Sequence, residues 1–221
     1  MIDIENYLLQ LIELLKDSYG HRLVYVGLQG SYLREEATDD SDMDIMVVVE
    51  ELSVSDLAQY RKIIGSLPYT EKSCGFICGK EDLCNWNPLE IGHLLHSTKD
   101  YYGVLRDLVP EYTDLDVRNF VKLSVNNLYH EICHRYLHAA PEKNAAKLPG
   151  TYKSTFFILQ NVYYLRTGRY VGTKKELQPL LEGRDRSVLA RCMGYAQGLQ
   201  YDFEESFDLL FSWCKETVRN I

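Results

Sequence analysis

A pair of aspartates directly before an unbroken apolar run constrains this chain more than any other feature. Asp42 and Asp44 precede and enter a segment whose residues 45–49 are all apolar. A run that is apolar at every position is typical of a strand buried on both faces, so we expect a sheet covered by helices. Because positions two apart in a strand point to the same side, the two carboxylates should lie together at the start of this strand.

The paired carboxylates predict a site for a hard divalent cation. Two carboxylates repel each other unless a cation lies between them, and their oxygens suit Mg²⁺ or Mn²⁺. The surrounding segment 34–51 holds eight acids and one base, Arg34. A solvated turn is the alternative for residues 39–42, because turns favour Asp and Ser. So many acids beside a buried strand favour the metal site.

Ten residues separate a Gly-Ser pair, Gly30-Ser31, from Asp42. Gly30 would let the backbone approach a ligand closely, and the Ser31 hydroxyl with nearby N–H groups could hold phosphate oxygens. A metal held by Asp42 and Asp44 would bridge those oxygens to the carboxylates. The four residues together therefore predict a site for a phosphate-bearing ligand and its metal.

This segment resembles the signature of the DNA polymerase β-like nucleotidyltransferase superfamily. The resemblance rests on residues 26–31 (VGLQGS), the ten-residue gap and residues 41–48 (SDMDIMVV). It is strongest to the small-molecule branch, which includes the aminoglycoside nucleotidyltransferases. The resemblance implies a short mixed sheet with flanking helices, an appended helical domain, and transfer of a nucleoside monophosphate from ATP or another NTP.

The same resemblance implies a third carboxylate on a neighbouring strand. The expected strand, within residues 71–78, has no acid at its centre. Glu71 at its start is the candidate for this catalytic role, and Glu81 and Asp82 beyond its far end are alternatives. Surface acids at strand ends explain all three residues as well. A non-catalytic nucleotide-binding module therefore stays open as a second function.

Strand and helix signals divide the chain near residue 110. Before it, apolar runs predict strands at 23–27, 45–49 and 74–78, between helices over 4–15, 54–67 and 88–98. After it, periodicity predicts only helices, over 114–139, 152–167, 174–181, 187–199 and 202–219. We thus predict an α/β (α+β) fold in two domains: a nucleotidyltransferase domain at 1–110 and an all-helical substrate- and nucleotide-binding domain at 111–221.

The helical half reverses the charge balance of the acidic loop. Residues 143–191 hold ten Lys and Arg against three acids. A basic half facing the acidic loop would form a cleft suited to Mg–NTP. Residues 163–171 with Lys174 are similar to the last helix and basic turn of streptomycin/spectinomycin adenylyltransferases, which implies Arg169 and Lys174 as phosphate ligands. A solvated helix surface is the alternative for each, and we expect Lys143 on a surface loop.

A zinc-protease motif competes with this interpretation. His130-Glu131-Ile132-Cys133-His134 matches H-E-x-x-H, which places two histidines on one helix face. His138 continues the stripe, but three histidines along one straight face make a poor tetrahedral set. Surface or packed histidines explain the stripe better. Glu131 could instead activate an acceptor, as a glutamate of the helical domain does in related small-molecule enzymes.

Net charge and composition limit the classes of partner that this chain is expected to bind. With 24 basic and 32 acidic residues the net charge is −8, which argues against a nucleic-acid partner and favours a cationic, hydroxylated acceptor such as an aminoglycoside. Small relatives of the superfamily act on a protein toxin, so an antitoxin-type protein partner stays open. We expect no membrane partner and a cytoplasmic location. No apolar run approaches the roughly 20 residues of a membrane span, the first residues lack a basic signal region, and the cysteines are scattered.

Overall fold

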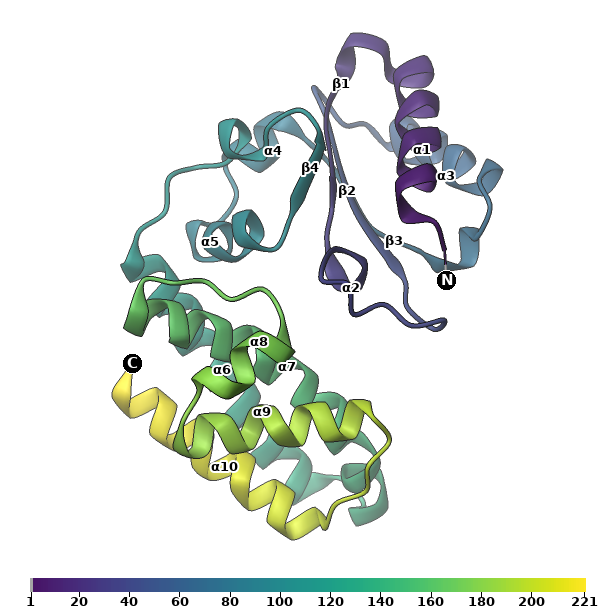
Figure 1. The fold of residues 1–221 in the computed structure, drawn as a ribbon. Coiled ribbons are helices and arrows are strands. Elements are labelled where there is room, and N and C mark those ends of the chain that lie inside the picture. Colours follow the sequence, from purple (N-terminus) through teal and green to yellow (C-terminus); the bar gives the residue numbers. More distant parts are fainter. Residues whose placement is uncertain (1) are drawn as a thin grey trace. The chain divides into compact units, whose positions relative to one another are not determined.

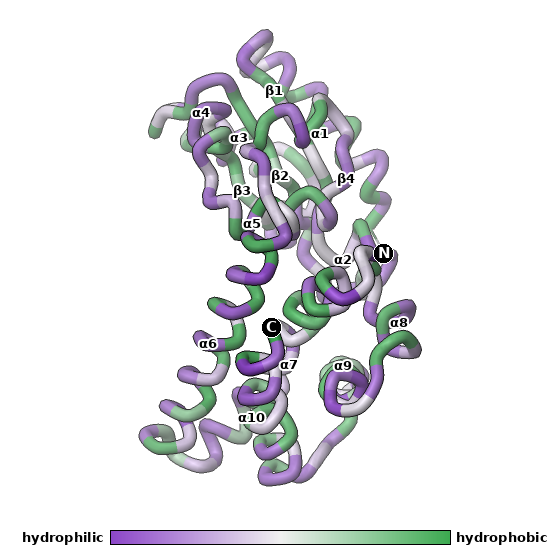
Figure 2. The backbone as a smooth tube through the Cα atoms, turned by 90° about the vertical axis from the view of Figure 1, so that its left-hand side faces the viewer, coloured by the Kyte–Doolittle hydropathy of each residue, from purple (hydrophilic) through white to green (hydrophobic). Residues whose placement is uncertain are grey.

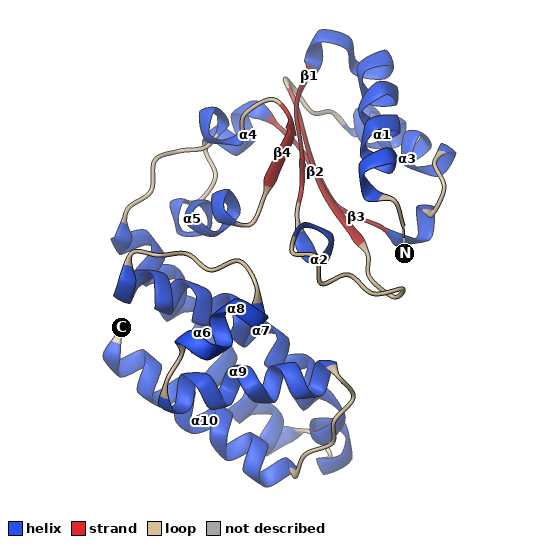
Figure 3. Ribbon diagram, viewed as in Figure 1, coloured by secondary structure: helices blue, strands red, loops and turns tan. Residues whose placement is uncertain are grey.

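The computed structural model describes residues 2–221, and the chain forms two compact units (Figure 1). The first unit ends at Tyr112 and the second begins at Thr113. Sheet and helices alternate in the first unit, whereas the second contains helices alone among the described residues (Figure 3). The predicted fold class, a short mixed sheet with helices followed by an all-helical region, is confirmed.

The first unit is built on a four-stranded sheet in the order β3-β2-β1-β4. Its strands are β1 (Leu23–Leu28), β2 (Met43–Val49), β3 (Ser73–Gly79) and β4 (Lys99–Tyr102). β1 runs antiparallel to β2 and β4, whereas β2 and β3 are parallel. The short edge strand β4 was not expected, because its sequence has no apolar run. It forms a strand because it pairs with β1, although its own residues lack the apolar pattern of a strand.

Helices cover both faces of this sheet (Figure 3). α1 (Ile4–Tyr19) and α3 (Val54–Ser66) cover one face, and the short α4 (Lys80–Cys84) and α5 (Pro88–His96) cover the other. Residues 45–49 of β2 are fully buried, as a strand with two covered faces requires. Ile45 and Val47 pack with α1, and Met46 and Val48 pack with Leu83 of α4.

Local capping signals account for the predicted helix starts. Ser53 accepts a hydrogen bond from the Asp56 N–H and forms a capping box at the start of α3. Asn87 caps α5, and Pro88 occupies its first turn, where the missing N–H costs nothing. Thr113 forms a second capping box, which opens α6 (Asp114–His138) at the start of the second unit.

The second unit packs its long helices around one apolar core, centred on Tyr152, Phe156 and Trp213. After α6 come α7 (Pro141–Thr167), α8 (Lys174–Leu177), α9 (Gly183–Ala196) and α10 (Phe203–Asn220). Short 3₁₀ turns cover Gly20–Arg22, Thr70–Lys72, Leu105–Leu108 and Gln178–Leu180. Hydrophobic and hydrophilic residues are interspersed along α6 and α10 (Figure 2). Across residues 2–221, we find no helix with the length and apolarity that a bilayer span requires.

α7 corrects two expectations. It begins at Pro141 rather than near residue 152, and Pro149 lies inside it. Proline and glycine are poor helix formers, so Pro149 and Gly150 hid this stretch from a propensity-based prediction. Burial of Leu148 and Tyr152 on either side of Pro149 supports the helix nonetheless. Lys143, expected on a loop, lies exposed in the first turn of α7.

Candidate active site

The backbone of Gly30 packs directly against the carboxylate of Asp44. Gly30 follows β1, opens the one-turn helix α2 (Gly30–Leu33) and has a φ of +70°. A β-carbon at this position would lie 2.7 Å from Asp44 Cγ and closer still to Oδ2. The N–H of Gln29 donates to the Asp44 carbonyl oxygen at 2.8 Å, which joins the two segments. Ser31 is the second residue of α2, so the structure brings the Gly-Ser pair and Asp44 together.

Unfavourable electrostatics surround the Asp44 carboxylate. Burial raises its pKa above the ordinary aspartate value, and the nearby charge of Asp42 raises it further. A hydrogen bond from the Cys74 thiol and the charge of Arg34 act in the opposite direction. Asp42 itself lies exposed just before β2. A cation bound between the two carboxylates would remove both their repulsion and the cost of burying charge.

Cys74 stands where the neighbouring strand could have presented a third carboxylate. In the parallel pairing of β2 and β3, Asp44 lies opposite Cys74. Glu71 lies exposed in the 3₁₀ turn just before β3, at the same end of the sheet as Asp42 and Asp44. The residue paired with Asp44 on β3 is therefore not an acid. Glu71, in the turn that leads into β3, is the acid at this end of that strand.

Glu81 and Asp82 lie at the other end of the sheet. Both belong to α4, which follows β3, and the stretch from Cys74 to Gly79 extends about 17 Å at strand spacing. The carboxylate of Asp82 accepts a hydrogen bond from the Gly79 N–H at 3.2 Å. Asp82 therefore caps a helix, and neither alternative to Glu71 is close to Asp44.

The donor atoms fit a magnesium ion that is shared with phosphate. Within residues 2–221 no three His, Cys, Asp or Glu side chains group closely enough to enclose a metal. Mg²⁺ is usually held by one or two carboxylates together with water and substrate phosphates. Asp42 and Asp44 supply such a partial set of hard oxygen ligands, and their electrostatics favour a cation. The residues present therefore fit Mg²⁺ or Mn²⁺ bound together with a nucleotide.

His93 on α5 is a titratable residue near Arg34, and no sequence signal identified it. Burial, followed by the positive charge of Arg34, lowers the pKa of His93 to about 4. His93 is therefore neutral at physiological pH. Arg34 acts on both His93 and Asp44, so it links the two groups electrostatically. A lone histidine on an apolar helix carries no pattern, and only the fold reveals its neighbours.

The two basic candidates of the second unit border one loop. Arg169 is exposed at the end of α7, and its N–H donates to Thr167 Oγ1 at 3.2 Å. Lys174 begins α8, with its Nζ 4.6 Å from the centre of the Phe156 ring. Lys174 is thus partly held by a buried aromatic residue, whereas Arg169 lies at the surface.

Gln160, missed by the sequence analysis, fastens this loop to α7. Its buried side chain donates from Nε2 to the carbonyl oxygens of Val171 at 2.8 Å and Gly172 at 3.2 Å. A buried glutamine is costly unless it is hydrogen-bonded, so these bonds constrain the loop that leads to Lys174. The only sequence signal was a polar residue on an otherwise apolar helix face.

The histidine stripe of α6 shows surface character. His130, His134 and His138 are exposed, and successive ring centres lie 6.1 and 4.8 Å apart. Glu131, which a zinc protease would use as its base, forms an ion pair with Arg135. No metal-holding group is found there among the described residues. The geometry favours the surface interpretation of the H-E-x-x-H motif.

The chain resembles known proteins in part of its sequence and in its fold. Residues 8–73, which include Gly30, Asp42 and Asp44, match the family model of the nucleotidyltransferase domain. The fold is similar to the crystal structure of spectinomycin adenyltransferase AAD(9) from Enterococcus faecialis with ATP and spectinomycin, with a TM-score of 0.60 and 14% identity over 98% of this chain and 99% of that chain. No curated protein sequence matches. The resemblance noted in the sequence is thereby confirmed: residues 8–73 match a nucleotidyltransferase domain, and the fold of the whole chain is similar to that of an adenyltransferase.

Proposed function

We propose that this chain is a Mg²⁺-dependent adenylyltransferase that acts on a hydroxyl of a small, cationic acceptor of the aminoglycoside kind. The observation that carries the proposal is the packing of Gly30 against the half-buried Asp44 carboxylate beside Asp42, inside the matched domain. The structural relative was solved with ATP and spectinomycin, which supports this nucleotide and this acceptor class. The net charge of −8 supports a cationic acceptor.

In this proposal Asp42 and Asp44 hold the divalent cation, and the Gly30 backbone with Ser31 binds phosphate oxygens. When bound, Mg²⁺ neutralises charge on the phosphates. Arg169 and Lys174 are the proposed cationic ligands of the β- and γ-phosphates.

The acceptor hydroxyl oxygen attacks the α-phosphorus, the bond to the β-phosphate oxygen breaks, and pyrophosphate leaves in line. Glu71 is the proposed base that takes the hydroxyl proton, because it is the acid that precedes β3 at the Asp44 end.

Substitution of the two aspartates tests this function. The purified chain is incubated with Mg–ATP and spectinomycin, and pyrophosphate release and the mass of the acceptor are measured. We expect Asp42→Asn and Asp44→Asn to abolish transfer, because each removes a charged ligand and little packing. Asp40→Asn is the matched control, since Asp40 is an exposed acid of the same loop outside the strand. Full transfer by either site variant would refute the proposal.

Cys74 favours a second candidate function, a nucleotide-binding module without transfer activity. The register opposite Asp44 holds a thiol rather than a carboxylate. In that case the wild-type chain would bind Mg–ATP but release no pyrophosphate with any acceptor, whereas Cys74→Glu could gain activity. ATP labelled at the α-phosphate and incubated with the chain and a cell lysate distinguishes the remaining alternative, because an antitoxin-type enzyme would transfer the α-phosphate label to a protein and release unlabelled pyrophosphate.

A further inference from the structure

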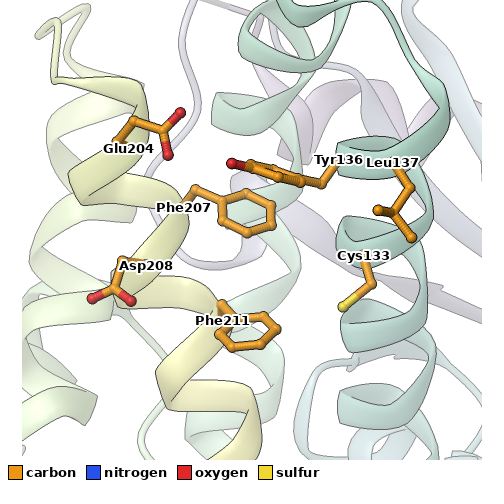
Figure 4. Close-up of a pocket in the computed structure, with 7 residues that line it drawn as sticks. All are labelled: Cys133, Tyr136, Leu137, Glu204, Phe207, Asp208 and Phe211. Atoms are coloured by element: carbon orange, nitrogen blue, oxygen red, sulfur yellow. The ribbon is translucent and has the colours of Figure 1, made fainter.

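A pocket of about 410 Å³ lies between α6 and α10 of the second unit, and none of its lining residues is one assigned to the nucleotide (Figure 4). Its volume falls within the range of about 300–1,000 Å³ that is usual for small-molecule sites. The α6 side contributes Cys133, Tyr136 and Leu137, and the α10 side contributes Glu204, Phe207, Asp208 and Phe211. Nothing in the proposed adenylyl transfer uses this pocket.

Aromatic rings form the walls of the pocket. Figure 4 shows Phe207 and Phe211 projecting from α10 toward α6, and Tyr136 projecting the opposite way. The ring centres of Tyr136 and Phe207 lie 4.6 Å apart, and those of Phe207 and Phe211 lie 6.1 Å apart. Tyr136 is 49% exposed and its neighbour Leu137 is 74% exposed. Large apolar side chains left open beside each other are typical of a binding surface.

The charge at the rim is negative. Glu204 and Asp208 are exposed lining residues of α10, and α10 has no Lys or Arg before Lys215. The Glu204 carboxylate lies on the side of the pocket that holds the Tyr136 hydroxyl (Figure 4). A favourable interaction with the helix dipole explains an acid in the first turn, as for Glu204. It does not explain Asp208, which lies one turn further along.

One ring of the pocket, Phe211, has a lysine of its own helix beside it. The Nζ atom of Lys215 lies 5.2 Å from the centre of the Phe211 ring, within cation–π distance. Lys215 thus shows that an ammonium group is accommodated beside Phe211, although there the group belongs to the chain itself. Phe207 and Tyr136 present similar rings nearer to the acidic rim.

From these contacts we infer that the α6–α10 pocket binds a small hydrophobic cation, an aromatic or alkylated ammonium compound. The apolar part of the ligand would lie between Tyr136, Phe207 and Phe211, with the charge directed to Glu204 and Asp208. None of its lining residues has a role in the proposed function, and its test needs neither nucleotide nor transfer activity.

Dye binding to the full chain tests the charge requirement. Acridine orange, a three-ring cation, is titrated by fluorescence, with anilinonaphthalene sulfonate as an anionic aromatic comparison. We expect the double variant Glu204→Gln/Asp208→Asn to weaken acridine orange binding about threefold to tenfold, because two partly solvated carboxylates are removed. Binding of the sulfonate dye should not weaken. Glu205→Gln is the matched control, since Glu205 lies on the same helix but does not line the pocket.

Tyr136→Ala locates the dye. This exposed position tolerates truncation, and loss of the ring should weaken acridine orange binding about tenfold. Unchanged dye affinity in both Tyr136→Ala and the double variant would overturn the inference, as would an equal loss in Glu205→Gln. A wild-type dimer that Tyr136→Glu converts to a monomer would also overturn it, because a second copy of the chain would then cover the pocket.

Discussion

Replacement of Gly30 by alanine should separate the cost of backbone strain from the cost of displacing Asp44. At a φ of +70° an alanine is strained by about 1–2 kcal/mol. For a chain of this size that strain lowers Tm by about 2–8 °C. The new β-carbon also meets the Asp44 side chain, with Cγ at 2.7 Å, so the carboxylate must move. A displacement of about 1 Å in a catalytic group can cost about a hundredfold in rate.

Gly198→Ala supplies the matched control for this experiment. Gly198 also has a positive φ, +79°, but a β-carbon there meets no atom within 4 Å. Thermal denaturation should show a loss of Tm in both variants, and the larger loss in Gly30→Ala. Calorimetry with Mn–ATP and the spectinomycin transfer assay should show defects in Gly30→Ala alone, with transfer reduced at least about a hundredfold. Equal transfer by the two variants would refute the role assigned to the contact between Gly30 and Asp44.

Three further predictions concern single side chains. Lys174→Ala should weaken Mg–ATP binding about tenfold to a hundredfold in calorimetry, because a charge-assisted phosphate contact is lost, whereas exposed Lys175→Ala should not. Gln160→Leu should weaken Mg–ATP binding in the same calorimetric assay, because the loop that leads to Lys174 loses its two hydrogen bonds to α7. The pKa of His93 is lowered from 6.5 to about 4, so between these pH values the unfolded chain binds a proton that the folded chain does not. The free energy of unfolding should therefore fall as pH drops through this window, by about 3 kcal/mol in total, and the pH dependence of stability in urea denaturation should be weaker in His93→Gln.

Local patterns made most of the fold predictable. The apolar run of β2, the capping residues Ser53 and Asn87, and the periodic helices each carry their signal within a few residues. β4 carries no such signal, because it becomes a strand only by pairing with β1.

In the candidate site too, some residues carry a local sequence signal and others do not. Gly30, Asp42 and Asp44 lie on adjoining segments with a recognisable spacing, and the fold brings Gly30 and Asp44 together. The position of Cys74 opposite Asp44 depends on the register of two strands, which no local pattern specifies. The roles of His93 and Gln160 depend on contacts with distant parts of the chain.

The proline inside α7 divides this helix into two segments of different local stability. Pro149 has no N–H to donate to the carbonyl four residues earlier, and Gly150 adds backbone freedom beside it. After this point the helix is anchored by the buried Tyr152 and Phe156, whereas most residues from Pro141 to Lys147 are exposed. Opening of the first two turns should therefore cost much less free energy than opening of the rest. Amide exchange along α7 would then change abruptly near Pro149, and opening of residues 141–147 would break the buried hydrogen bond from Arg135 Nε to Asn144 Oδ1 but leave the apolar core, which includes Leu148, in place.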